Sequence, residues 1–306
     1  MRSLIFFFFI YFFSAFLFLT NKNFNVAQNH ILLIKDGESF SIIKNRLEDL
    51  KITIPFLVDF YFYTSGADKS LRKGEYLIDK GSDLFSFSTN LAKGKIYYRS
   101  FYIPEGSIVT QFLSDEEQNS FCIYKGLEEC ELEGMFHPNT YYFELGENIN
   151  ELLNEAFNTQ LLIATEQFEK IKENKIVKDV YDLITIASIL EKESCPNERS
   201  LISGIIYNRL EKGMKLQIDS TVIYGIENFN GNLTKNDLRK STPFNSYTNY
   251  GLPPKPISTP SKSSLIAAAN PTQSEYLYFV SKGKCAHQFS KSYPEHVEAI
   301  KKYQLN

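Results

Sequence analysis

The residues between 183 and 225 place the strongest constraint on how this chain can fold. An apolar stretch at helical spacing begins at Leu183, ends in Glu191-Lys192-Glu193, and runs into a dense polar segment. The polar side chains of that segment are Tyr207, Asn208, Arg209, Gln217, Asp219, Thr221 and Tyr224. Hydrogen-bonding side chains next to an apolar helix must be satisfied by partners or remain in contact with water. We therefore expect the polar segment to line a site.

Helix geometry distinguishes the two glutamates. At about 100° per residue the apolar side chains form one arc. That arc contains Leu183, Ile184, Ile186, Ala187 and Leu190, and Thr185, Ser188 and Lys192 are expected to point away from it. Glu191 projects within the arc and Glu193 lies just beyond its edge, so Glu191 is predicted to be the more buried. Burial raises a carboxyl pKa toward the range that a general acid needs. The alternative is that residues 191–193 are the solvated end of an ordinary helix.

Further motifs follow this helix in a fixed order. They are Tyr207-Asn208-Arg209, Gln217-Ile218-Asp219, Phe244-Asn245-Ser246-Tyr247, Gly251-Leu252-Pro253-Pro254, Tyr278-Phe279-Val280, His287, Phe289 and His296, with Glu133-Gly134-Met135-Phe136-His137-Pro138 upstream. The series resembles the YceG-like family of membrane-anchored endolytic murein transglycosylases, and the resemblance covers nearly the whole chain. So many ordered matches are more specific than any single motif.

The resemblance implies a reaction and its acid. It places the family's catalytic glutamate on Glu191, with Glu193 as the main rival. The implied reaction cleaves the β-1,4 bond between N-acetylmuramic acid and N-acetylglucosamine in nascent glycan strands and limits their length. One carboxyl suffices, because the muramic acid 6-hydroxyl is an intramolecular nucleophile and leaves a 1,6-anhydro end. No cofactor is expected.

Other polar residues are expected to bind the substrate. Asn208, Gln217, Asn245 and Tyr247 are expected to hydrogen-bond N-acetyl groups and hydroxyls, and Tyr224 to offer a ring face to a sugar. A structural hydrogen bond is the alternative for each. Asp219 is expected to support other groups in the site, or to pair with Arg209. His287 and His296 lack zinc-like spacing, so they are interpreted as structural or substrate-adjacent, and no metal is expected.

An apolar run at residues 4–19 predicts an N-terminal anchor. Rich in Phe, it would span roughly 24 Å as a helix, which is short for a bilayer but workable. A cleaved signal peptide is the alternative, yet no A-x-A-like cleavage site follows. Arg2 precedes the run and weakly favours a cytoplasmic N-terminus. We expect a transmembrane anchor at residues 1–21 in the inner (plasma) membrane, with the catalytic domain periplasmic.

The remaining chain predicts an α+β fold in two parts. Residues 22–100 resemble a small LysM-like α/β module, with a strand at 31–34, helices after Ser39, at 55–63 and at 84–91, and a turn and strand at 71–78. Whether the module binds glycan or only acts as a spacer stays open. Residues 101–306 are expected to form the larger mixed α+β catalytic domain, including a core-facing helix at 149–171.

Charge and cysteine content exclude some functions. A net charge of −3 gives no electrostatic case for nucleic-acid binding, which normally demands a basic patch. Cys122 and Cys130 are candidates for a disulfide in an exported domain, and Cys195 lacks a neighbouring histidine that would activate a nucleophilic thiol. Two further classes stay open. One is a hydrolytic muramidase; the other is a non-catalytic glycan-binding scaffold that serves cell-wall synthases.

Three positions depart from the family pattern. Asn139 stands where the family usually has Asp, and Ser220 where Pro is common. Cys285-Ala286 stands where Gly often precedes the histidine. These departures affect the local loop shapes that the resemblance implies.

Overall fold

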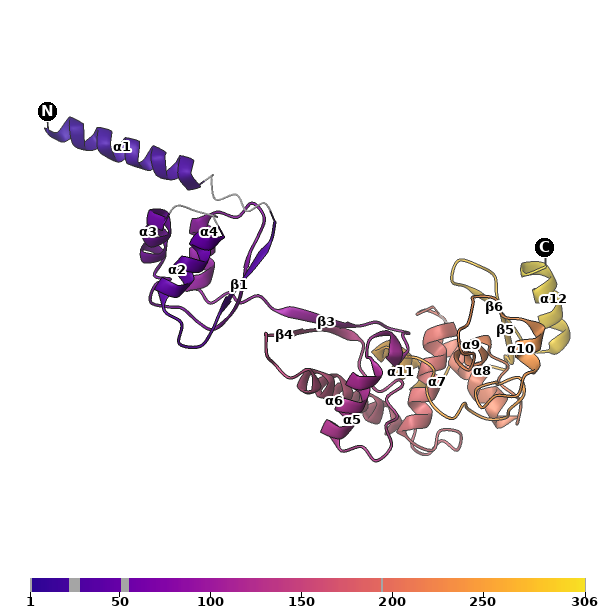
Figure 1. Ribbon diagram of the computed structural model, residues 1–306. Coiled ribbons are helices and arrows are strands. Elements are labelled where there is room, and N and C mark those ends of the chain that lie inside the picture. The colour runs from indigo at the N-terminus through magenta and orange to yellow at the C-terminus, as the bar shows by residue number, and fades with distance from the viewer. Residues whose placement is uncertain (1, 22–27, 51–54, 194, 306) are drawn as a thin grey trace. The chain divides into compact units, whose positions relative to one another are not determined.

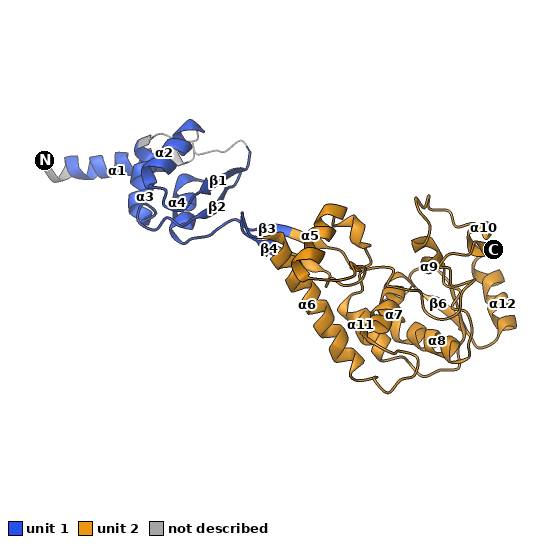
Figure 2. Cartoon of the chain, turned by 60° about the horizontal axis from the view of Figure 1, so that its bottom comes forward, with its two compact units in different colours: residues 1–100, 142–147 blue, residues 101–141, 148–306 orange. Residues whose placement is uncertain are grey.

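The computed structural model describes residues 2–21, 28–50, 55–193 and 195–305, and its helices and short strands form a mixed α+β architecture (Figure 1). The predicted fold class is confirmed. The chain divides into two compact units, residues 1–100 with 142–147 and residues 101–141 with 148–306 (Figure 2). In the described part of the chain, the strands form three two-stranded sheets.

The first unit combines a two-stranded sheet with short helices. Its elements are α1 (Arg2–Asn21), β1 (His30–Ile34), α2 (Phe40–Asp49), α3 (Pro55–Ser65), β2 (Gly74–Ile78) and α4 (Leu84–Ala92). Strand β1 pairs antiparallel with β2, with His30 opposite Ile78. The buried core includes Ile43, Leu47, Phe62 and Tyr76. The order β1-α2-α3-β2 follows the sequence prediction closely.

Helix caps explain some boundaries of the first unit. Asp83 precedes α4 and accepts a hydrogen bond of 2.7 Å from the Ser86 N–H, which satisfies one free donor of the first turn. Ser39 occupies the same position before α2, as predicted, but its side chain makes no capping bond. The strand expected after a turn within residues 71–78 is β2, which begins at Gly74.

Helix α1 is apolar, and most of its described side chains are exposed, including Phe7, Phe9 and Tyr11. Within the described residues, however, no helix combines the length and apolarity that crossing a bilayer demands. The predicted transmembrane span is therefore not confirmed by the structure.

The second unit contains most of the helices. Its elements are η1 (Val109–Gln111), α5 (Asp115–Lys125), β4 (Asn139–Phe143), α6 (Ile149–Phe168), α7 (Val180–Glu193), α8 (Arg199–Glu211), α9 (Asp219–Tyr224), α10 (Lys235–Arg239), α11 (Lys262–Ala269), β5 (Tyr278–Ser281), β6 (His287–Ser290) and α12 (Tyr293–Tyr303). Strand β3 (Arg99–Ile103) and β4 pair where the chain passes from one unit to the other. The core-facing helix predicted at 149–171 is confirmed as α6.

Helix α7 is the central element of the second unit. Every residue from 183 to 190 is buried, and α7 packs against α6, α8, α9 and α11. Thr185 and Ser188, which were expected to point away from the apolar arc, are also buried, only 3% and 0% exposed. The reason is that the chain near residue 257 covers this side, where the Ile257 N–H donates to Ser188 Oγ at 3.0 Å. A helix enclosed all round has no polar face.

A glycine on α8 fixes the segment that leads to β5. A Cβ at Gly204 would lie 2.2 Å from the carbonyl oxygen of Thr272, so only glycine allows this approach. The Thr272 N–H also donates to the Ser200 carbonyl at 2.8 Å. Strands β5 and β6 then form an antiparallel hairpin in which Ser281 lies opposite His287. The hairpin is thereby held beside the ends of α7 and α8.

Candidate active site

A cavity of about 440 Å³ opens where α7 ends. Its walls come from the end of α7, the end of α8, the start of α9, the hairpin β5–β6 and helix α12. The polar and aromatic side chains that line it include Glu193, Arg209, Gln217, Asp219, Tyr247, Tyr278, His287 and His296. The polar segment that the sequence singled out therefore does contribute to a concave site.

Glu193 is the carboxyl of α7 that lines this cavity. Burial has the largest effect and raises its pKa, hydrogen bonding from Ser220 lowers it, the charge of Asp219 raises it, and His287 lowers it. One carboxyl oxygen, Oε1, accepts a hydrogen bond of 3.3 Å from the Ser220 N–H at the start of α9. The net effect favours the protonated form, so Glu193 can carry a proton into a cavity wide enough for a sugar.

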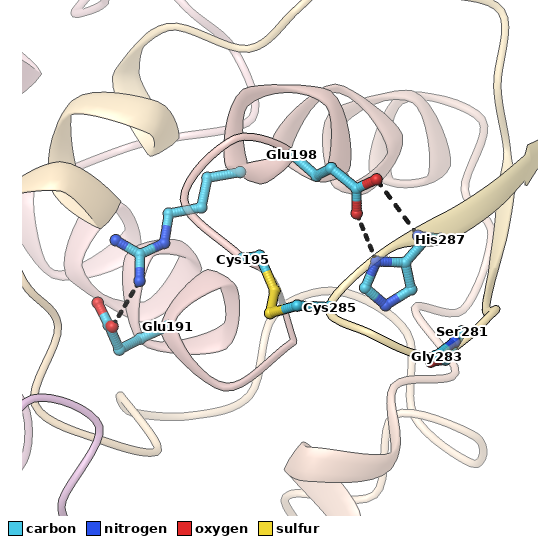
Figure 3. The surroundings of a disulfide bond; sticks show 8 residues. Glu191, Cys195, Glu198, Ser281, Gly283, Cys285 and His287 are labelled. Atoms are coloured by element: carbon cyan, nitrogen blue, oxygen red, sulfur yellow. Dashed lines mark hydrogen bonds and ion pairs between the residues drawn. A yellow bond between two sulfur atoms is a disulfide. The ribbon is translucent and has the colours of Figure 1, made fainter.

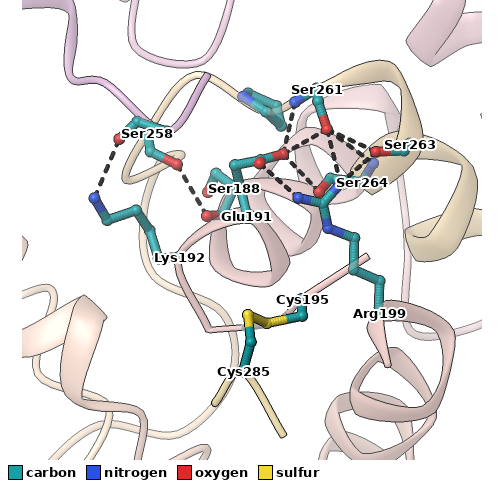
Figure 4. Close-up of polar contacts among 12 residues, drawn as sticks. Ser188, Glu191, Lys192, Cys195, Arg199, Ser258, Ser261, Ser263, Ser264 and Cys285 are labelled. Atoms are coloured by element: carbon teal, nitrogen blue, oxygen red, sulfur yellow. Dashed lines mark hydrogen bonds and ion pairs between the residues drawn. A yellow bond between two sulfur atoms is a disulfide. The ribbon is translucent and has the colours of Figure 1, made fainter. Parts of the chain in front are cut away.

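Glu191 lies in a different environment. Its Oε1 accepts from Arg199 Nη2 at 2.7 Å, and its Oε2 accepts from the Ser261 N–H at 2.8 Å, Ser261 Oγ at 2.6 Å and Ser264 Oγ at 2.7 Å. Figure 4 shows these groups converging on the carboxylate. The side chains of Glu191 and Arg199 are only 6% and 8% exposed. Among the described residues that line the cavity, Glu191 does not appear.

The two glutamates are therefore not equivalent. That Glu191 is the more buried of the two stays a prediction; its side chain is only 6% exposed, and its hydrogen-bond partners are serines and a guanidinium. Both oxygens of Glu191 accept hydrogen bonds from protein donors. Glu193 lines the cavity and accepts a hydrogen bond from the Ser220 N–H.

Three of the expected substrate-binding residues do line the cavity. Asp219 Oδ1 accepts a hydrogen bond of 2.6 Å from the Tyr247 hydroxyl. Gln217 Oε1 accepts from Arg209 Nη2 at 2.6 Å, and Gln217 adopts a left-handed backbone conformation with φ of 52°. The Arg209 guanidinium also donates to the carbonyls of Lys215 and Leu277. Its hydrogen bonds therefore go to these groups and to Gln217, whereas Asp219 accepts from Tyr247.

The other three expected residues bond within the protein. Asn208 Nδ2 donates to the carbonyls of residues 274 and 276, which fixes the segment before β5. Asn245 is fully buried, and its Nδ2 donates to the carbonyls of residues 237, 238 and 240. The Tyr224 hydroxyl donates to Glu133 Oε2 at 3.0 Å. These contacts match the structural alternative that the sequence left open for each.

Glu133 is a buried carboxyl whose state the sequence did not reveal. Burial raises its pKa to about 7, although hydrogen bonds from Tyr224 and from the Val109 N–H act in the opposite direction. Among the described residues that line the cavity, Glu133 does not appear. Through Val109 and Tyr224, Glu133 connects the segment before α5 to α9, the helix whose first residue lines the cavity.

Two disulfides are present. Cys122 and Cys130 are bonded, with Cα atoms 5.6 Å apart, as the sequence suggested. Cys195 and Cys285 are also bonded, with Cα atoms 5.7 Å apart, which the sequence did not predict. Cys195 is therefore no free thiol, and its partner lies in the loop between β5 and β6.

Comparisons with known proteins identify the family to which the chain is similar. The model of the YceG-like family matches residues 32–302. An endolytic murein transglycosylase of Bacillus subtilis (strain 168) is 28% identical over 302 residues, covering 88% of this chain and 83% of that protein. One from Streptococcus pneumoniae (strain D39) is 34% identical over 155 residues, which is 49% of this chain and 28% of that protein. The crystal structure of a yceG-like protein from Listeria monocytogenes covers 89% of this chain and 99% of its own, with a TM-score of 0.56 and 28% identity.

Proposed function

The chain belongs to the YceG-like family, and from this premise we propose that it is an endolytic murein transglycosylase. Its substrate is the peptidoglycan glycan strand, cleaved at the β-1,4 bond between N-acetylmuramic acid and N-acetylglucosamine. One observation carries the proposal. A carboxyl whose pKa is raised by burial, that of Glu193, lines a cavity of about 440 Å³ together with aromatic and hydrogen-bonding side chains.

Glu193 is proposed as the general acid. The protonated carboxyl donates its proton to the glycosidic oxygen, and the bond from that oxygen to C1 of the muramic acid breaks. The 6-hydroxyl of the same muramic acid attacks C1 and closes a 1,6-anhydro ring. Its proton returns to the Glu193 carboxylate, so the enzyme ends in its starting state and no water is consumed. Because the nucleophile belongs to the substrate, no second protein group has to hold a water molecule.

The other cavity residues support this acid. The charge of Asp219 favours the protonated form of Glu193, and it would also stabilise the positive charge that develops at C1. Tyr247 holds Asp219 by its hydroxyl, and Arg209 holds Gln217. Gln217 and Tyr247 are proposed to bind sugar hydroxyls or N-acetyl groups. The same role for Asn208, Tyr224 and Asn245 stays a prediction, although each already has partners in the protein.

Glu191 is proposed to be structural. It ties α7 to Arg199 and to the start of α11, which fixes the helix that presents Glu193. The assignment of the catalytic role to Glu191, which the sequence favoured, stays a prediction. The experiment that tests Glu193 also tests it.

The decisive experiment incubates the full chain with purified glycan strands and identifies products by mass spectrometry. E193Q is expected to abolish 1,6-anhydro products and to retain strand binding. E191Q is compared at a temperature where circular dichroism shows it folded, and activity is expressed per folded molecule. E211Q alters an exposed glutamate at the end of α8 and serves as the matched control. Full cleavage by E193Q would refute the assignment, and loss of cleavage only in folded E191Q would transfer the role to Glu191.

The same products separate the other two classes. A hydrolytic muramidase, with Asp219 holding water, would give reducing ends in place of anhydro ends. A non-catalytic scaffold would bind strands without shortening them in the parent protein and in every variant. Association with cell-wall synthases belongs to this proposal too, and co-purification from detergent-solubilised membranes tests it.

We propose that α1 attaches the protein to the inner membrane, with a cytoplasmic N-terminus and the second unit outside. The support is the apolar sequence and the exposed aromatic rings of α1, such as Phe7 and Phe9. Membrane fractions of cells that produce the full chain, washed with alkaline carbonate, should retain the protein. Deletion of residues 2–21 should release it.

The LysM-like assignment of residues 22–100 is likewise a proposal. It rests on the order β1-α2-α3-β2 and on antiparallel pairing of the two strands. Glycan binding by this unit would appear as strand retention by E193Q that is lost when residues in the first unit are altered. Unchanged retention would leave the unit as a spacer.

A further inference from the structure

Two bridges connect the same two short segments of the chain beside the cavity. Cys195 is disulfide-bonded to Cys285, although 90 residues separate them in sequence. Glu198, three residues after Cys195, bonds to His287, two residues after Cys285. Figure 3 shows the disulfide and the hydrogen-bonded Glu198–His287 pair on neighbouring parts of the two segments.

Glu198 binds His287 at two points. Its Oε2 lies 2.7 Å from His287 Nδ1, and its Oε1 accepts from the His287 N–H at 3.2 Å. Both the ring and the backbone of His287 are therefore fixed. With Nδ1 engaged, only Nε2 remains for other partners. His287 also lines the cavity and contributes to the pKa of Glu193.

The loop that carries Cys285 is backbone-strained. Lys284 and Cys285 both adopt left-handed conformations, with φ of 50° and 59°, directly after Gly283 at φ of 82°. Residues other than glycine keep such conformations when the surroundings hold them there. The disulfide is one such restraint, and it acts on one of the strained residues itself.

The hairpin and the acid are joined over a short path. Cys195 follows Glu193 by two residues, which span at most about 7 Å of chain. The disulfide then brings the Cα of Cys285 within 5.7 Å of that of Cys195. Hairpin residues Tyr278, Phe279 and His287 form one wall of the cavity that Glu193 lines. The distance between this wall and the carboxyl therefore depends on the two bridges.

We propose that the Cys195–Cys285 disulfide and the Glu198–His287 pair form a two-point clamp that holds the β5–β6 hairpin at a fixed position over Glu193. The four residues are positioning residues for the glycan-cleaving site, and the inference rests on the proposed function. The clamp makes the activity sensitive to the redox state of one disulfide. Reduction of the disulfide allows the β5–β6 hairpin, which a sugar would contact, to move. The hydrogen-bonded Glu198–His287 pair then remains as the weaker restraint.

The second disulfide supplies a matched control. Cys122–Cys130 joins α5 to the segment after it, and neither cysteine lines the cavity. In the full chain, C195S/C285S is expected to lower kcat about tenfold, because displacement of a catalytic wall by about 1 Å has effects of this order or larger. The control C122S/C130S should keep kcat within about twofold. E198Q retains the shape of the side chain and should lower kcat by less than C195S/C285S does. When the two changes are combined, kcat should fall by at least the product of the two separate factors.

Two readouts separate positioning from general destabilisation. The alkaline limb of the pH profile of kcat/KM should move in C195S/C285S, because the distance between His287 and Glu193 changes. Lowered stability alone would leave the limb in place. Reversible reduction gives the second readout. In C122S/C130S only the Cys195–Cys285 bridge can accept two electrons from dithiothreitol, so reduction should lower kcat and reoxidation restore it. This arm keeps the inference testable even when C195S/C285S folds poorly.

The outcomes are distinct. If kcat, KM and the pH limb of C195S/C285S match the parent while E193Q is inactive, the clamp is refuted and the proposed function stands. Unchanged activity of C122S/C130S on full reduction, verified by alkylation and mass spectrometry, refutes it as well. If E193Q keeps full activity, the proposed function fails and the premise of the clamp fails with it.

Discussion

The Tyr247 hydroxyl donates a hydrogen bond of 2.6 Å to Oδ1 of Asp219, and both side chains line the cavity that contains Glu193. Burial and the neighbouring Asp219 raise the pKa of Tyr247, so the hydroxyl stays a donor across the physiological range. The carboxylate that acts on Glu193 is thus itself held in place by a group from a separate loop. Sequence order alone would not pair residues 219 and 247.

Removal of this hydroxyl should impair catalysis more than binding. Y247F leaves Asp219 without its donor and free to rotate, so kcat on glycan strands is expected to fall about tenfold, in line with the loss of one hydrogen bond to a charged group. Steady-state release of anhydro products measures the effect. Y250F changes an exposed tyrosine of the same loop and should stay within about twofold. Equal losses in both variants would contradict the role of the Asp219 contact.

The rate should depend on the protonation of Glu193 in a defined direction. A general acid works only while protonated, so kcat/KM should fall as the pH rises through the raised pKa of Glu193. The charged groups that act on Glu193 are Asp219, which raises its pKa, and His287, which lowers it. D219N should therefore move the alkaline limb to lower pH. A limb that stays in place or moves upward would show that Asp219 does not act on the acid.

The two glutamates of α7 should differ in their effect on stability. E191Q leaves the Arg199 guanidinium buried without its carboxylate, which is expected to cost about 3–5 kcal/mol in free energy of unfolding. E193Q resembles the protonated carboxyl and should cost less than about 1 kcal/mol. Chemical denaturation of both variants measures these values. Equal stability of the two variants would indicate that Glu191 is not the structural member of the pair.

Glu133 should make the stability depend on pH. Its folded pKa of about 7 lies above the ordinary glutamate value of 4.5, so the folded state binds more protons between these values. Its contribution is therefore complete below about pH 4.5 and is lost as the pH rises through 7, to an extent of about 3 kcal/mol. E133Q mimics the protonated carboxyl and should remove this dependence. Denaturation of parent and variant at pH 5, 6, 7 and 8 gives the comparison, and parallel curves would contradict the raised pKa.

The close approach at Gly204 should make this position intolerant of a side chain. G204A places a methyl group against the Thr272 carbonyl and is expected to cost about 2 kcal/mol or more, seen as a lower Tm. S203A, at the neighbouring buried position, removes a hydroxyl that has no hydrogen-bond partner among the residues the structure describes, and should be neutral or slightly stabilising. A parent-like Tm for G204A would show that the loop before β5 relaxes freely.

Local sequence patterns predicted much of the fold. The spacing of apolar residues located α2 and α6, and a short apolar run located β1, because these elements contribute buried residues to a core formed by near neighbours. The pattern was less informative for α7. Residues 183–190 are all buried, so Thr185 and Ser188 are buried although they lie outside the apolar arc, and the chain near Ile257 contacts Ser188.

The site shows the same limit. The sequence identified the stretch from Glu191 to Asp219, and three of its six expected binding residues line the cavity. It did not reveal the neighbours of Glu191, because Ser261 and Ser264 lie about 70 residues further along the chain. The bridge from Cys195 to Cys285 was equally hidden. An even number of cysteines gave the only signal, and spacing alone does not define the pairing.

The assignment of residues 142–147 to the first compact unit affects where the protein can be truncated. This short segment belongs to the first compact unit, although the chain on both sides of it belongs to the second. A fragment that starts at residue 101 would therefore keep the segment and lose the part of the protein against which it packs. Recombinant versions intended for crystallisation or assay should retain both units, and truncation is better placed before β1.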